Sequence, residues 1–158
     1  MKKVKKIIVS FLLMCMLCVG MTCVASATAA EFRFSDPQTS VGAEVEVTAK
    51  VSSAKALNTI QATLSYDKTK LRFISGDDAT GGDGTITISR NDGNAGTTME
   101  FNLKFQALDE GTTSVEVAKV DGIDSNGVAL EITSGSSSVS IAEGDKSLIQ
   151  EEDTSSAV

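Results

Sequence analysis

The stretch LNTIQATLSYDKTKLRF, residues 57–73, decides the fold of this chain. Apolar residues occupy every second position from Ile60 to Tyr66, which is the period of a β-strand with one buried face. A Tyr-Asp pair then starts a turn, and Leu71 and Phe73 form the apolar side of a second strand. Two such strands predict a sheet that is packed on one face and exposed on the other.

The same period of two recurs along the rest of the chain. Its apolar positions are mostly β-branched or aromatic, turn residues fill the gaps, and no segment shows helical periodicity over three turns. These features predict an all-β fold: a single-domain, antiparallel, two-sheet β-sandwich of about nine strands with a jelly-roll-like arrangement. The expected strands centre on Phe32–Phe34, Val45–Val51, Leu57–Tyr66, Leu71–Phe73, Ile86–Ile88, Met99–Phe105, Val115–Val117, Leu130–Ile132 and Val139–Ile141.

Residues 1–27 are typical of a signal peptide. Four lysines open the chain, the run Ile7–Val19 is almost wholly apolar, and Ala25-Ser26-Ala27 places small residues at the spacing a signal peptidase requires. We expect cleavage after Ala27, with cleavage after Ala29 or Ala30 as alternatives. A retained membrane helix is disfavoured because the apolar run is short. The expected product is secreted and extracellular, either released or associated with the cell surface.

The remainder divides into a sandwich domain, residues 31–142, and an acidic, serine-rich segment, residues 143–158, which we expect to be a disordered tail. Removal of the signal peptide also removes all three cysteines, so no disulfide is expected. It takes four of the 14 Lys and Arg and none of the 21 Asp and Glu, so 10 basic against 21 acidic side chains leave a net charge of about −11. An acidic surface disfavours nucleic acid and anionic membranes as partners.

The residue types available argue against an enzyme. The chain has no histidine, and after signal removal it has no cysteine, so the commonest general base, zinc ligands and thiol nucleophile are all missing. Two carboxylates suffice for glycoside hydrolysis, but eight of the 21 acids lie in glycine-rich turns, where turn chemistry alone accounts for them. We therefore expect no catalytic residue.

Two loops crowd oxygen ligands around flexible glycines, at residues 76–84 (GDDATGGDG) and 121–127 (DGIDSNG). If Gly127 is placed at the invariant glycine of an EF-hand loop, Gly122 falls where the first Asp belongs and Thr133 where the bidentate Glu belongs. Hairpin and sheet-crossing turns are the favoured interpretation, with a looser calcium site as the alternative. We expect no metal-ligand set or other cofactor in this chain, and calcium only on the partner or in these acidic loops.

A planar aromatic platform for polysaccharide is also disfavoured. The chain has no tryptophan and one tyrosine, and the five phenylalanines that follow the signal peptide each fall on the apolar side of a strand. A hydrogen-bonding groove for a soluble glycan stays open as an alternative.

From about Phe32 to Ile141 the chain resembles the cohesin domain, the sandwich module of cellulosome scaffoldins. The resemblance rests on a "G-x-x-V" strand entry at residues 42–45, on the "Y-D" stretch of residues 56–73, on the FNLKF strand at 101–105, on Gly111, and on residues 124–141. The Tyr-Asp turn is shared with related sandwiches, including carbohydrate-binding modules.

The resemblance implies a secreted, noncatalytic module that holds dockerin-bearing polysaccharide-degrading enzymes on the outward face of one sheet. In the family, that face uses the strand before Tyr-Asp and paired strands later in the chain. Here Thr59 and Gln61 align with positions where family members often carry Asn and Asp. A glycan-binding module of the same architecture and a surface-structural or adhesion domain are the alternatives. The alternation predicts which side chains point outward, and the resemblance implies that these bind the partner: Thr59, Gln61, Thr63, Thr85, Thr87, Ser89, Glu100 and Asn102.

Overall fold

The computed structural model describes residues 26–93 and 95–149. Within them the chain forms eleven strands and a short 3₁₀-helix, η2. The elements are β1 (Thr28–Phe34), β2 (Gln38–Ser40), β3 (Glu44–Ser53), β4 (Leu57–Tyr66), β5 (Leu71–Gly76), β6 (Ala79–Gly82), β7 (Thr85–Asn91), β8 (Thr98–Ala107), β9 (Gly111–Asp124), β10 (Leu130–Ser134), β11 (Ser136–Ala142) and η2 (Lys146–Leu148).

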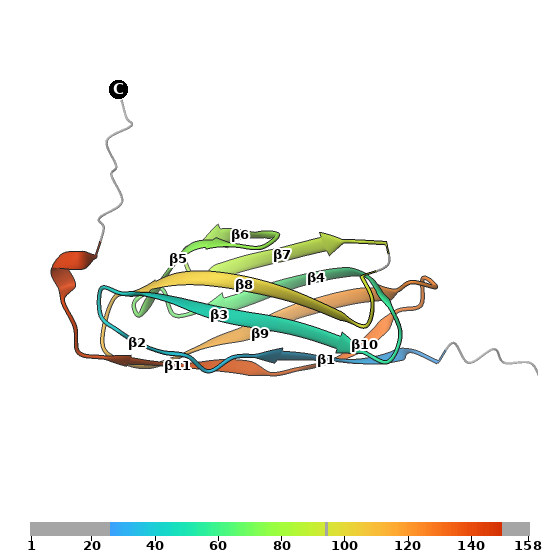
Figure 1. Cartoon of the computed structure of the whole chain (residues 1–158), viewed down its shortest axis with the longest axis horizontal. Coiled ribbons are helices and arrows are strands. Elements are labelled where there is room, and N and C mark those ends of the chain that lie inside the picture. The colour runs from blue at the N-terminus through green and yellow to red at the C-terminus, as the bar shows by residue number, and fades with distance from the viewer. Residues whose placement is uncertain (1–25, 94, 150–158) are drawn as a thin grey trace, which may run out of the picture.

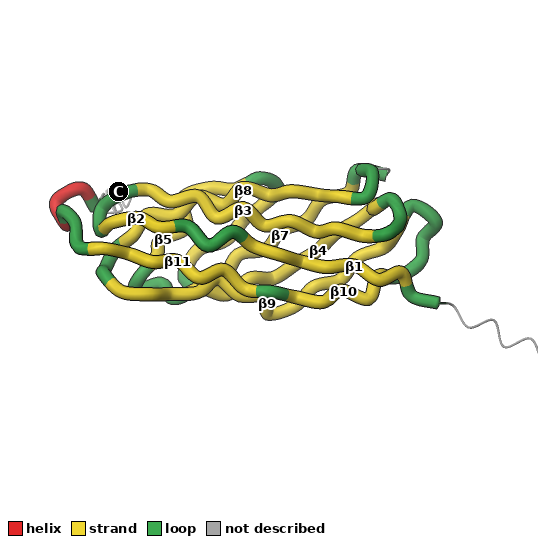
Figure 2. Tube along the Cα trace, turned by 60° about the horizontal axis from the view of Figure 1, so that its bottom comes forward, coloured by secondary structure: helices red, strands yellow, loops and turns green. Residues whose placement is uncertain are grey.

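These strands build the predicted sandwich. One sheet has five strands in the order β10-β1-β3-β8-β5, and the other has six in the order β2-β11-β9-β4-β7-β6. The two sheets lie as layers along a common long axis (Figure 1), and many of the connecting loops lie at its two ends (Figure 2). All strand pairs are antiparallel except β1 with β10 and β11 with β2, which are parallel. The all-β, two-sheet prediction is confirmed.

The expected strand count of about nine is corrected to eleven. Each of the nine predicted segments corresponds to an observed strand, and the two additional strands are β2 and β6. β2 is three polar residues long, and β6 is ATGG. Neither segment alternates between apolar and polar side chains, so the period of two carries no signal there.

The core fills the space between the two sheets. The inward positions of β3, β4 and β8 are apolar at every second residue and almost completely buried, as their alternation predicts. Phe105 is fully buried and packs edge-on against the rings of Tyr66 and Phe73, with centroids 5.3 and 5.7 Å away. No described residue belongs to a helix long and apolar enough to span a bilayer.

The described part of the expected tail, residues 143–149, lies against the sandwich. Gln106 Nε2 donates to the carbonyl oxygens of Leu148, at 3.0 Å, and of Gly42, at 3.1 Å, and Ile149 packs against the core. Residues 150–158 lie outside the described part of the chain, as does nearly all of the predicted signal peptide. The expectations for these segments stay predictions.

Candidate partner-binding face

The outer face of the six-stranded sheet brings together six of the eight residues expected to bind a partner. β4 lies between β7 and β9, and outward side chains stand opposite one another across the three strands. The register gives four rows of three residues, which we call the polar face: Asn91, Thr59 and Ile123; Ser89, Gln61 and Asp121; Thr87, Thr63 and Lys119; Thr85, Ser65 and Glu116.

The β9 members of the polar face were not predicted from the sequence. Thr63 pairs with Lys119 and Leu64 pairs with Val117, so Ala118 is an extra residue without a β4 partner. Such a bulge shifts the alternation by one residue along the strand. The sequence signal is the spacing of three between the inward-facing Val117 and Val120, which interrupts the period of two.

The polar face has few charges and two adjoining hollows. Eight of its twelve residues carry an uncharged hydroxyl or amide group, and its cation, Lys119, lies 2.9 Å from the carboxylate of Asp121. A hollow of about 400 Å³ lies beside Ile123, Leu130 and Gln61, and one of about 230 Å³ lies beside Thr63, Lys119 and Gln61. Gln61 and Asp121 line both hollows and therefore form the centre of the face.

Glu100 and Asn102 point outward as expected, but from the opposite sheet. They lie on β8, next to β3 in the five-stranded sheet, and so cannot share a surface with Gln61. The alternation predicts which side of a strand faces outward and does not predict the sheet to which the strand belongs. The placement of all eight residues on one face is therefore corrected.

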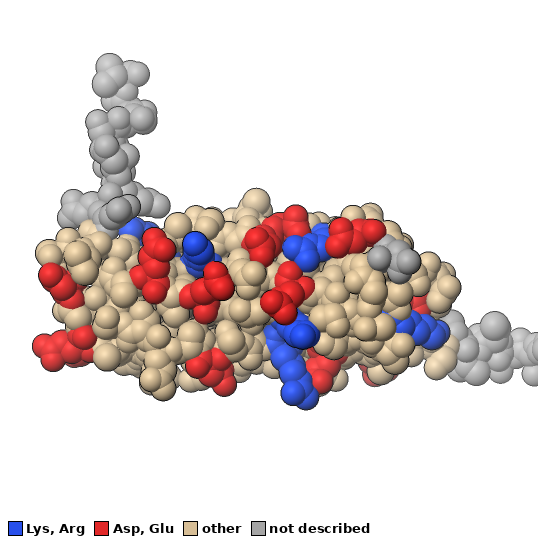
Figure 3. Space-filling model, viewed as in Figure 1, with Lys and Arg blue, Asp and Glu red and all other residues tan. Residues whose placement is uncertain are grey.

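Opposite charges face one another on this second surface. Lys50 lies across from Glu100, with Nζ 4.0 Å from Oε2, and Glu46 lies across from Lys104. Asn102 Oδ1 accepts a hydrogen bond of 3.1 Å from the Thr48 hydroxyl. Figure 3, seen from the β3 and β8 side, shows acidic and basic side chains interspersed over this sheet. Glu100 and Asn102 thus have partners within the chain.

The acids of residues 76–84 point to different partners. Asp77 accepts hydrogen bonds from the backbone and side-chain nitrogens of Asn102, Asp78 pairs with Arg90, and Asp83 pairs with Lys68. Within the described residues no three His, Cys, Asp or Glu side chains converge to hold a metal ion. The acids of residues 76–84 are thus held in separate pairs.

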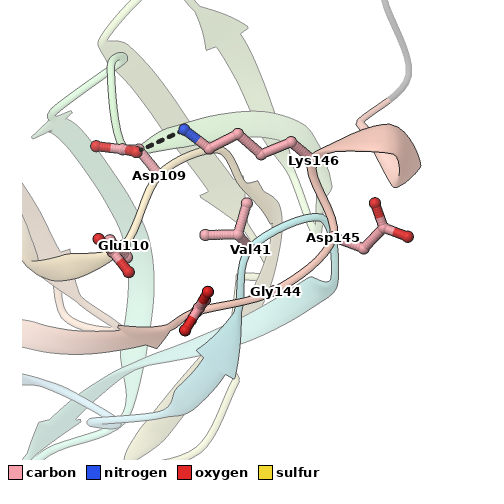
Figure 4. A pocket seen from close by; sticks show the side chains of 7 residues that line it. Val41, Asp109, Glu110, Gly144, Asp145 and Lys146 are labelled. Carbon is pink, nitrogen blue, oxygen red and sulfur yellow. Dashed lines mark hydrogen bonds and ion pairs between the residues drawn. The ribbon is translucent and has the colours of Figure 1, made fainter.

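A third hollow, of about 520 Å³, lies at the end of the sandwich between the β8–β9 turn and residues 143–146 (Figure 4). Lys146 reaches across it to Asp109, with Nζ 3.1 Å from Oδ1, and Lys70 Nζ lies 2.7 Å from Oδ2. The hydrogen bonds from Lys70 and then Lys146 lower the pKa of Asp109 to about 2. These ion pairs join three segments of the chain and engage both carboxylate oxygens of Asp109, one of the four acidic residues that line the hollow.

The family model for the cohesin domain matches residues 30–141, which include both sheets and the polar face. The chain belongs to the cohesin family. The match covers more than half of the chain and ends one residue before the end of β11, so residues 143–149 of this cohesin lie outside it. A search of curated proteins found no match.

Solved structures share the fold of this cohesin domain at low sequence identity. The sixth cohesin of scaffoldin B from Acetivibrio cellulolyticus, in complex with a Cel5 dockerin, has a TM-score of 0.61 and 20% identity, over 74% of this chain and 100% of that one. The OlpA cohesin of Clostridium thermocellum, in complex with a dockerin, has a TM-score of 0.66 and 11% identity, over 72% and 99%. A non-cellulosomal cohesin from the archaeon Archaeoglobus fulgidus has a TM-score of 0.61 and 15% identity, over 74% and 92%.

Proposed function

We propose that this cohesin domain is a noncatalytic, exported binding module whose polar face holds the dockerin of a partner protein. The observation that supports this is the set of four rows across β7, β4 and β9. Short side chains on a hydrogen-bonded sheet lose little conformational freedom when a partner docks. The dockerin-bound relatives support a protein as the partner.

Recognition on this face is centred on Gln61 and Asp121, which line both hollows. A docked module excludes water there, and a few central contacts set the affinity. The partner brings its own calcium, and it attaches a polysaccharide-degrading enzyme to a scaffold or to the cell surface. A cellulosome is one setting for such a module, and the archaeal relative is described as non-cellulosomal.

Direct glycan binding has less support. Among the described residues Phe32, Phe101 and Phe105 are fully buried, Tyr66 is buried, and Phe34 and Phe73 pack against the core. A stacking platform for sugar rings therefore does not form on either outer face. Glycan retention without protein binding is kept as an outcome of the test below.

The test measures binding of recombinant dockerin modules to the immobilised mature chain, with calcium and with chelator. A Gln61→Arg, Thr87→Arg variant adds two long, charged side chains to the polar face, and we expect it to lose about 100-fold in affinity. Glu100→Arg is the matched control, because it places the same side chain on the opposite sheet, and we expect it to bind like wild type.

Three results would contradict the proposal. Loss of binding by Glu100→Arg alone would move the interface to the five-stranded sheet. Failure of any dockerin to bind, with retention on soluble or insoluble glycans, would favour the carbohydrate-binding alternative. Binding of neither class would favour a surface-structural domain.

A further inference from the structure

Asp124, the last residue of β9, carries a buried carboxylate that the polar face does not use. Its side chain is 0% exposed, and Oδ1 accepts the backbone N–H groups of Asn126 and Val128 at 2.9 Å each. Oδ2 accepts a hydrogen bond of 3.0 Å from the hydroxyl of Thr28, and Lys55 Nζ lies 3.9 Å away. The Val128 bond is the largest cause of a lowered pKa of Asp124, so this group is a buried anion at neutral pH. A buried anion is costly unless donors or cations surround it.

Thr28, which donates to this carboxylate, is the first residue of β1 and is only 5% exposed. Its backbone nitrogen lies 3.2 Å from the carbonyl oxygen of Ala129, and the parallel register with β10 begins at the Thr28–Leu130 pair. Ser26 and Ala27, the two described residues before it, are exposed and belong to no strand. Ordered strand structure therefore begins at the residue that follows the Ala-Ser-Ala sequence.

We propose that the mature chain begins at Thr28 and that its new α-ammonium group is a structural part of the domain. This group would keep the bond to the carbonyl oxygen of Ala129 and would lie beside Asp124, which the hydroxyl of the same residue contacts. Hydrolysis adds water across the Ala27–Thr28 amide. Ala27 leaves with a carboxylate, and the Thr28 nitrogen becomes a primary amine that takes up a proton near neutral pH. Because Thr28 is buried in the folded domain, the cut precedes the addition of β1 to its sheet.

The alternative cleavage sites would damage this arrangement. A cut after Ala29 or Ala30 removes Thr28 together with its hydroxyl, and leaves Oδ2 with the ammonium of Lys55 at 3.9 Å. A cut after Ala30 also removes a buried core residue and the first three pairs of the β1–β10 ladder. The fold thus favours the bond after Ala27, which the sequence predicts, over its two alternatives.

The first test is the intact mass of the protein that a secreting bacterial host releases from the full precursor. We expect a chain that starts at Thr28. A start at Ala30 or Glu31 would overturn this inference and leave the proposed export intact. A retained leader would overturn both, and neither result would bear on dockerin binding, which is measured separately.

The second test asks whether the ammonium group matters. Two forms of the mature chain, one with a free Thr28 amine and one with that amine acetylated, are compared by thermal unfolding. We expect acetylation to lower Tm by about 3 °C or more, because it removes the charge beside Asp124. Equal Tm values would overturn the structural role of the amine.

Asp121→Asn is the matched variant, since Asp121 lies on the same strand with its carboxylate 64% exposed. It should keep the acetylation effect in full, whereas Asp124→Asn should abolish it. If Asp124→Asn does not fold, the Tm difference between the free and acetylated wild-type chains still tests whether the amine stabilises the domain.

Discussion

Lys70 and Asp109 form an ion pair of 2.7 Å that joins the residue before β5 to the turn between β8 and β9. Lys146, from the segment that follows β11, pairs with the other oxygen of the same carboxylate at 3.1 Å. One acidic side chain therefore links three parts of the chain at one end of the sandwich. The lowered pKa of Asp109, about 2, follows from these two lysines.

This pKa predicts an acid-dependent loss of stability. The folded-state pKa lies below the ordinary value of about 3.9, so the stabilisation is present above pH 4 and is lost as the pH falls toward 2. Asp109→Asn should unfold at a lower temperature than wild type at pH 6, and the difference should vanish near pH 2. Thermal unfolding between pH 2 and 6 at low salt measures it, since salt screens this half-exposed pair. Parallel curves for the two proteins would contradict the assignment.

Gly42 has no side chain, and this allows the backbone of residues 143–149 to pack directly against it. It has φ of 86°, and a Cβ there would lie 2.3 Å from the carbonyl oxygen of Asp145. Gly42→Ala should lower the free energy of unfolding by about 2 kcal/mol and expose residues 143–149 to proteases. Gly127→Ala is the control, because its φ of 77° is similar and no atom lies within 4 Å of the added methyl group. A similar loss of stability in both variants would show that it comes from the left-handed backbone conformation and not from the clash with Asp145.

Phe105 anchors the aromatic cluster of the core. It is fully buried between the two sheets, and the rings of Tyr66 and Phe73 pack on it edge-on. Phe105→Ala should cost about 3–5 kcal/mol of unfolding free energy, measured by urea denaturation. Phe73→Ala should cost less because Phe73 is only partly buried. If both variants lost the same unfolding free energy, the difference in burial between the two rings would not explain their contributions to stability.

Gly122 of β9 pairs with the buried core residue Ile60 of β4. An added Cβ would lie 2.8 Å from Ile60 Cδ1 and 2.9 Å from both Leu130 Cδ1 and the Thr59 carbonyl oxygen. Gly122→Ala should therefore destabilise the domain by about 1–3 kcal/mol. The double variant with Leu130→Ala should lose less than the sum of the single losses, because it removes one of the clashing groups. Strict additivity in urea denaturation would count against a steric cause.

The sequence was sufficient to predict each strand whose side chains alternate, because burial of one face imposes that pattern. It was insufficient for β6, where glycines carry no pattern, and for the Asp121 region, where the bulge at Ala118 shifts the alternation. Glu100 shows a further limit. Its outward direction follows from the pattern on β8, but its sheet depends on the chain crossing between layers after β7, which no local signal encodes.

The start of β1 and the 3₁₀-helix η2, which follows β11, lie at opposite ends of the long axis of the sandwich (Figure 1). A tension applied between these two points acts parallel to the strands. The ladders of β1 with β3 and β10, and of β11 with β9, are then loaded in shear, so that many hydrogen bonds resist together. A pull along the length of the domain would therefore meet several ladders at once and would not open them one bond at a time.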